Sequence, residues 1–78
     1  MDMKIKVTVI GPLSEYFDGQ KTREIYLSGE AALGNILDQA GLPREKYSFA
    51  IVNGIKVNAA YIAKENDEVV VFPLISGG

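Results

Sequence analysis

The sequence predicts a single α+β domain in which one main helix packs across one face of a mixed sheet of four or five strands. Two observations lead to this class. Several short segments alternate apolar with other residues, and only one longer segment has a helical period. With 78 residues, 47% hydrophobic and 23% charged, the chain has the length and composition of one globular domain. We assign residues 1–78 to this domain, with residues 72–78 as an extended C-terminal tail.

Alternation predicts the first two strands. In residues 3–10, Met, Ile, Val and Val face one side, while Lys, Lys, Thr and Ile10 face the other. Gly11-Pro12 ends this strand, and residues 22–27 form the second. Between them, residues 13–17 carry apolar side chains at roughly helical spacing, so we expect a short turn that covers the edge of the core.

A change of period predicts the main helix. Its apolar stripe consists of Leu33, Ile36, Leu37 and Ala40. Ser28 is the candidate N-cap, and Glu30 in the first turn would oppose the helix dipole. Gly41 can adopt the left-handed conformation that ends a helix, and Pro43 prevents its continuation. Gly34 costs roughly 1 kcal/mol within a helix, which indicates either close packing or simple tolerance.

The second half of the chain predicts a hairpin and a central strand. Asn53-Gly54 separates the apolar runs 48–52 and 55–57, and this dipeptide is typical of a type I′ turn. Residues 68–72 form the last strand, whose run of three valines suits the centre of a sheet. Pro73 closes this strand because it lacks an amide donor. The element order places one helix between pairs of strands.

The composition argues against catalysis by side chains of this chain. The chain has no Cys, so it has neither a thiolate nucleophile nor a cysteine-built metal site, and it has no His to act as a general acid or base. The adjacent carboxyl groups of Asp67 and Glu68 point in opposite directions at a strand start. We therefore expect both in a solvated turn and predict no metal site.

The charge distribution argues against nucleic acid and membranes as partners. Eight Lys and Arg residues are scattered along a chain of net charge −2, without the basic block that a nucleic-acid surface requires. No apolar run approaches the roughly 18 residues of a membrane span. We expect a soluble, cytoplasmic protein.

The C-terminal residues form an uncharged tail that could enter another protein. Pro73, Leu74, Ile75, Ser76, Gly77 and Gly78 would reach roughly 20 Å if fully extended. The two terminal glycines have no Cβ, so the terminal carboxylate could pass along a narrow channel and become the reacting group. The alternative is an ordinary flexible terminus without a function. Two terminal glycines arise by chance in roughly 0.5% of chains, so the pair alone does not exclude this alternative.

Three segments carry a resemblance to a known family: residues 5–9, residues 50–54 with Asn53-Gly54, and residues 66–78 with the terminal Gly-Gly. On these segments the chain resembles the MoaD/ThiS family of ubiquitin-like β-grasp sulfur carriers, in particular the small subunit of molybdopterin synthase. The match covers roughly residues 3–78. Leu74 departs from the pattern, because many molybdopterin carriers have a second Pro there.

The resemblance implies a carrier that has no catalytic side chains of its own. An adenylyltransferase related to ubiquitin activators would use ATP to adenylate the Gly78 carboxylate, and a sulfurtransferase donor would convert it to a thiocarboxylate. The tail would then enter an acceptor similar to the large subunit of molybdopterin synthase. The implied activity is that of a carrier subunit in a sulfurtransferase, with no cofactor bound to the chain itself.

Two alternatives to this function stay open. One is a sulfur carrier for thiamin, tungsten cofactor or tRNA thiolation, although the position of Asn53-Gly54 in the second half favours the molybdopterin-like branch. The other is a ubiquitin-like modifier joined to target lysines, or a module that binds without covalent attachment.

An apolar surface for docking is predicted near the root of the tail. Val70 and Phe72 face away from Val69 and Val71, and Ile10 faces away from its own core-facing neighbours. We expect Ile10, Val70 and Phe72 to dock both the activating enzyme and the acceptor, with Lys56 at the border. The alternative is that Phe72 only covers the edge of its own core.

Overall fold

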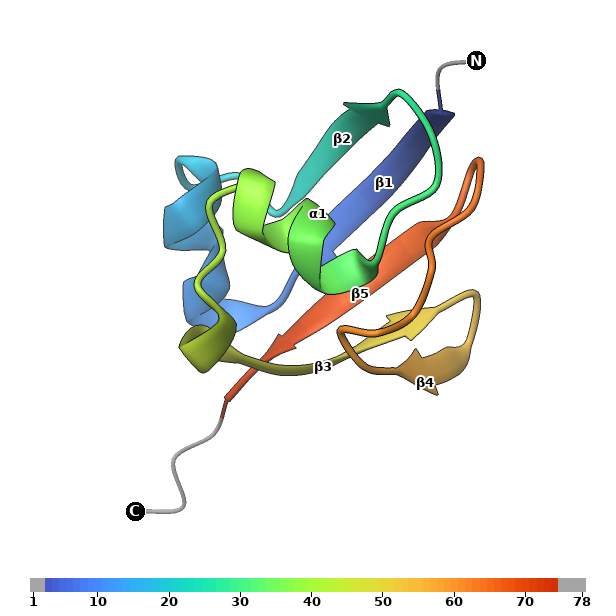
Figure 1. Ribbon diagram of the computed structural model, residues 1–78. Coiled ribbons are helices and arrows are strands. Elements are labelled where there is room, and N and C mark those ends of the chain that lie inside the picture. The colour runs from blue at the N-terminus through green and yellow to red at the C-terminus, as the bar shows by residue number, and fades with distance from the viewer. Residues whose placement is uncertain (1–2, 75–78) are drawn as a thin grey trace.

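The chain, described here by a computed structural model, forms one five-stranded mixed sheet with a main helix packed on one face (Figure 1). The structure describes residues 3–74. The strands lie in the order β2-β1-β5-β3-β4, so the last strand in sequence occupies the centre. The predicted α+β class is confirmed, with the larger of the two expected strand numbers.

The first hairpin agrees with the alternation in the sequence. Strand β1 (Met3–Val9) pairs antiparallel with β2 (Thr22–Leu27), and every second residue of β1 from Met3 onward is buried. The connection contains the 3-10 helix η1 (Gly11–Phe17), which buries Leu13 and Phe17 against the core. The expected apolar turn at the core edge is therefore confirmed.

Helix α1 (Leu33–Gln39) begins later than predicted, and Ser28 and Glu30 lie outside it. Its N-cap is Ala32, which makes no side-chain cap. The amides of Leu33 and Gly34 instead donate to the carbonyls of Tyr61 and Ala59, at 2.7 and 2.9 Å. The segment at residues 59–61 thus supplies the acceptors that a capping side chain would otherwise provide.

The two glycines of this region have different roles. Gly41 adopts a φ of +93° just after the helix, so the predicted left-handed stop is confirmed. At Gly34 an added Cβ would lie 2.8 Å from the Cβ of Ala59 and from a guanidinium nitrogen of Arg44. Gly34 therefore permits close packing of α1 on the segment that caps it.

The second half folds around the central strand. A short 3-10 helix, η2 (Arg44–Lys46), leads into β3 (Tyr47–Val52), which pairs antiparallel with β4 (Ile55–Val57). Asn53 and Gly54 both have positive φ, as the type I′ turn requires. Strand β5 (Glu68–Pro73) then pairs parallel with β1 and antiparallel with β3. The strand takes in Phe72 and Pro73, so the tail leaves the sheet later than at residue 72.

The core lies between the inner face of the sheet and the layer formed by α1 and η1. Buried valines of β1 and β5 meet apolar side chains of the helix, and η1 closes one end of this space. The largest side chains that are less than 2% exposed are those of Ile5, Val7, Val9, Leu13, Phe17, Leu33, Ile36, Leu37, Leu42, Val69 and Val71. Within residues 3–74, no helix is long and apolar enough to cross a membrane.

Candidate functional site

The candidate site begins where the tail leaves the sheet. Pro73 pairs with Tyr47 at the end of β5, and the Leu74 amide donates a hydrogen bond to the Lys46 carbonyl at 3.0 Å. The backbone is therefore held as far as Leu74, whose side chain is 56% exposed. The other predicted tail residues, Ile75, Ser76, Gly77 and Gly78, lie outside the described residues, so the reacting carboxylate stays a prediction.

The outer face of the sheet beside the tail root carries a cluster of apolar side chains. We call Phe49, Ile51, Val70 and Phe72 the outer patch. Strand register pairs Ile51 with Val70 and Phe49 with Phe72, and the two phenyl rings stack with their centroids 4.9 Å apart. All four side chains are half-buried, while Val69 and Val71 face the core. The predicted opposite facing along β5 is confirmed.

The two remaining predicted docking residues lie at the edges of this patch. The ammonium group of Lys56 is 4.7 Å from the centroid of the Phe49 ring, a cation–π contact that attaches β4 to the patch. Ile10 is 38% exposed, and its amide donates to the Val71 carbonyl. Ile10 therefore continues the outward face of β1 alongside β5.

Sequence reasoning missed Phe49 and Ile51, half of the outer patch. The signal was present in the hairpin: Asn53-Gly54 sets the register, and alternation backward from Val52 places Phe49 and Ile51 on the face opposite Ala50. The stacked pair also bears on the role of Phe72. Its ring packs on Phe49 at the outer surface and is not part of the buried core cluster.

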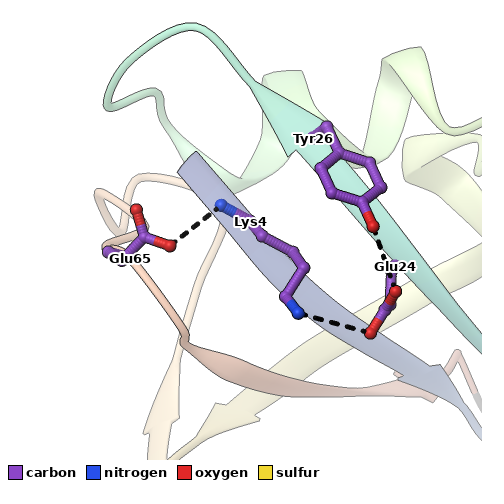
Figure 2. A network of polar contacts seen from close by, with 4 residues as sticks. All are labelled: Lys4, Glu24, Tyr26 and Glu65. Carbon is purple, nitrogen blue, oxygen red and sulfur yellow. Dashed lines mark hydrogen bonds and ion pairs between the residues drawn. The ribbon is translucent and has the colours of Figure 1, made fainter. Parts of the chain in front are cut away.

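The far end of the same face is polar (Figure 2). The Lys4 ammonium lies 3.6 Å from a Glu24 carboxylate oxygen, and the Tyr26 hydroxyl donates to the same carboxylate at 3.2 Å. The Lys4 amide donates to Glu65 at 3.3 Å. These groups are solvent-exposed, so the ion pair contributes only about 0 to 1 kcal/mol. Their effect is to confine the apolar surface of this face to the end near the tail.

Asp67 corrects one expectation from the sequence, because it is buried and not solvated. Only 5% of the residue is exposed. One carboxylate oxygen accepts hydrogen bonds from the Tyr61 hydroxyl at 2.7 Å and the Lys64 amide at 2.8 Å, and the other accepts from the Asn53 side-chain amide at 3.2 Å. Glu68 is exposed, as expected. Asp67 therefore joins the start of β5 to the hairpin turn and to the preceding loop.

Two tyrosines are held in their neutral form by their surroundings. The hydrogen bond from Tyr61 to Asp67, followed by burial and the negative charge of that carboxylate, raises the Tyr61 pKa above 10.0. Burial and the Asp38 carboxylate raise the Tyr47 pKa above 10.0, and the Arg44 guanidinium partly opposes them. Ionisation of either phenol is thus less favourable in the folded chain than in the unfolded chain.

We expect the fold to lose stability in alkaline solution as these phenols ionise. Since both folded-state pKa values are raised, the stabilisation is fully present below about pH 10 and is lost as the pH rises through the folded-state values. Urea unfolding measured from about pH 9 to pH 12 follows this loss. Tyr61→Phe should start from a lower stability and lose less of it over this range. A decline equal to that of the wild type would contradict the role of Tyr61.

The described residues contain no group of three or more acidic, His or Cys side chains that could hold a metal ion. The arrangement at the tail root instead combines a backbone held up to Leu74 with an apolar surface on one side of it. Such a surface can bind a partner protein.

Comparison with known proteins gives a family and a fold. The family model described as the ThiS family matches residues 7–78. No curated protein matches the chain in sequence. A solved structure of the HVO 2177 protein of Haloferax volcanii superposes with a TM-score of 0.78 at 22% identity, covering 99% of this chain and 88% of that one.

Two further solved structures have the same fold. Small archaeal modifier protein 1 of H. volcanii gives a TM-score of 0.72 at 19% identity, over 94% of this chain and 99% of that one. A protein described as a putative molybdopterin converting factor, subunit 1, from Pyrococcus furiosus gives 0.71 at 23% identity, over the same shares. These likenesses confirm the β-grasp fold.

Proposed function

The chain belongs to the ThiS family, as the resemblance in its sequence predicted, and from this membership we propose that it is a sulfur carrier. The Gly78 carboxylate is the reacting group. An activating enzyme of the ubiquitin-activator type adenylates it, and a sulfur donor then converts it to a thiocarboxylate. ATP binds to the activating enzyme and not to this chain, which carries no cofactor of its own. The dependence on ATP also favours the cytoplasm as the site of action.

One observation carries this proposal: β5, which leads to the C-terminal tail, lies at the centre of the sheet and ends beside the outer patch. Leu74 is held to Lys46, and Gly78, the residue proposed to react, is four positions further along the chain. These four residues extend at most about 14 Å, so the partner must approach the domain closely to act on the carboxylate. The outer patch offers an apolar surface for that approach. The chain has no His or Cys with which to perform the chemistry itself.

The proposed steps conserve atoms and electrons. A carboxylate oxygen attacks the α-phosphorus of ATP and pyrophosphate leaves, which gives the acyl-adenylate. A donor that supplies sulfur at the oxidation level of sulfide then adds to the carbonyl carbon. The carbon–oxygen bond to AMP breaks, AMP leaves, and a carbon–sulfur bond remains. No side chain of this protein takes part in either step.

We assign the acceptor to molybdopterin synthesis. The tail would enter a partner similar to the large subunit of molybdopterin synthase and deliver its sulfur there. The hairpin turn at Asn53-Gly54 and the likeness to the P. furiosus protein support this branch. A second candidate is attachment to the lysines of other proteins, which the likeness to small archaeal modifier protein 1 favours.

Intact-mass measurement tests the carrier proposal. We expect that co-expression with the activating enzyme of the same organism and a sulfur source raises the mass by the difference between one sulfur and one oxygen atom. The variant that lacks Gly78 should keep its mass, because its terminal residue no longer reaches the position of the reaction. An unchanged mass for the wild-type chain would reject the carrier function.

The same samples distinguish the modifier candidate. A modifier forms larger species joined through lysine side chains, and these disappear when Gly78 is deleted. A thiocarboxylate without such species supports the carrier alone. Isopeptide-linked species without a thiocarboxylate would reject the carrier function and support the modifier function.

A further inference from the structure

A groove of about 210 Å³ lies beside the tail root, separate from the outer patch. One wall is formed by η1 from Pro12 to Tyr16, and the other by Lys46, Pro73 and Leu74. Pro73 follows Phe72 in an extended strand, so the two side chains point to opposite faces. The tail therefore leaves the domain between the outer patch on one face and this groove on the other.

The surface of the groove combines an apolar base with one charge of each sign. Leu13 is buried at its base, and Tyr16 and Pro73 are half-buried. Glu15 and Lys46 are both exposed at its borders. Neither forms an ion pair with any residue in the described range 3–74. Both charges are therefore available to a partner.

The short reach of the tail requires a partner to contact this groove. Leu74 is fixed by its hydrogen bond to Lys46, and the four residues from there to the proposed reacting residue Gly78 span at most about 14 Å. A channel that receives these residues must bring its mouth against the surface that surrounds Leu74. The outer patch accounts for only one side of that surface, and the groove forms the other.

We propose that the groove is a second docking site for the activating enzyme, occupied by the rim of the channel that receives the tail. This inference rests on the proposed function, because it presumes that the tail is inserted for adenylation. The rim presents an apolar side chain to Tyr16 and Pro73, a cationic side chain to Glu15 and a carboxylate to Lys46.

The charges determine the chemistry of this rim. A purely apolar rim would strip water from Glu15 and Lys46 without replacing its hydrogen bonds, and an unpaired buried charge costs several kcal/mol. A rim with one complementary charge for each avoids this cost. Such pairs discriminate between partners more than they add to affinity, because a wrong partner would oppose like charges.

Exchange of pyrophosphate into ATP tests the assignment, with the activating enzyme of the same organism as the probe. This exchange reports formation of the acyl-adenylate at varied concentrations of the carrier. We expect Glu15→Lys and Lys46→Glu each to raise the KM for the carrier about tenfold, because each places a like charge against the rim. The kcat should not change, because the reacting carboxylate is untouched. The KM of both variants should also depend less on salt than that of the wild type.

Glu30→Lys is the matched control for Glu15→Lys, since it makes the same charge change at an exposed residue of the loop before α1. Its KM should stay within about twofold of the wild-type value. If the wild-type chain supports pyrophosphate exchange but Glu15→Lys and Lys46→Glu leave the KM unchanged, the groove is not a docking site. The proposed function would stand in that case. No exchange with the wild-type chain would reject the proposed function, and the groove assignment with it.

Discussion

Replacement of Asp67 by alanine is expected to lower the free energy of unfolding by about 3 kcal/mol. Asp67 is 5% exposed, and its carboxylate accepts three hydrogen bonds, from Tyr61, Lys64 and Asn53. Truncation leaves these donors without their acceptor in a part-buried location, and an unsatisfied buried group costs about 1 to 3 kcal/mol. Urea unfolding at neutral pH measures the loss. The free energy of unfolding of Asp67→Asn should lie between those of the wild type and Asp67→Ala. The single carbonyl oxygen of the amide can replace only part of the acceptor capacity of the carboxylate.

The control for this experiment is the neighbouring carboxylate. Glu68 is exposed and adjoins Asp67 in the sequence, so Glu68→Ala makes the same chemical change outside the buried network. We expect its free energy of unfolding to stay within about 0.5 kcal/mol of the wild-type value. Equal losses for the two variants would show that the buried carboxylate does not hold the turn to the sheet.

Replacement of Phe72 by aspartate is expected to raise the KM for the carrier about 100-fold in pyrophosphate exchange with the activating enzyme. Phe72 is stacked on Phe49 at the end of the outer patch nearest the tail, where a partner that receives the tail must approach. Central aromatic residues of an interface often cost 2 kcal/mol or more when removed, and the new carboxylate would also have to be desolvated. The kcat at saturating carrier should be retained, since the tail itself is unchanged.

Tyr26→Asp provides the matched comparison on the same face of the sheet. Tyr26 is 68% exposed at the polar end shown in Figure 2, so this change also replaces an outward aromatic side chain by a carboxylate. Its KM should remain within about twofold of the wild-type value. Thermal unfolding of both variants separates lost binding from lost folding. If the Phe72→Asp variant stays folded and keeps the wild-type KM, the outer patch does not take part in docking.

The sequence predicted the elements whose signals are local. Strict alternation in β1, the turn at Asn53-Gly54 and the left-handed stop at Gly41 each depend on residues close together in the chain. The central place of β5 was also indicated, because three successive valines suit a strand covered by neighbours on both edges. The facing of Val70 and Phe72 followed from the same alternation.

The features that were missed depend on contacts between distant segments. The start of α1 is set by carbonyls of Tyr61 and Ala59, which no local capping pattern reveals. Asp67 has the sequence context of a turn residue, and its burial depends on Tyr61 and Asn53, which only the folded chain places beside it. The groove likewise requires η1 and the end of β5 to meet, and these lie about 60 residues apart. A local sequence pattern cannot predict such long-range contacts, because they form only when the sheet is assembled.

The central position of β5 has a mechanical consequence for the proposed carrier function, in which a partner acts on the residues that follow this strand. Hydrogen bonds flank β5 on both sides, to β1 and to β3. A force that pulls the tail away along the strand direction loads these two ladders in shear, so that many bonds must break together, whereas an edge strand could be peeled off one bond at a time. If the tail is inserted into a partner as proposed, the partner can therefore pull strongly on it without unfolding the domain.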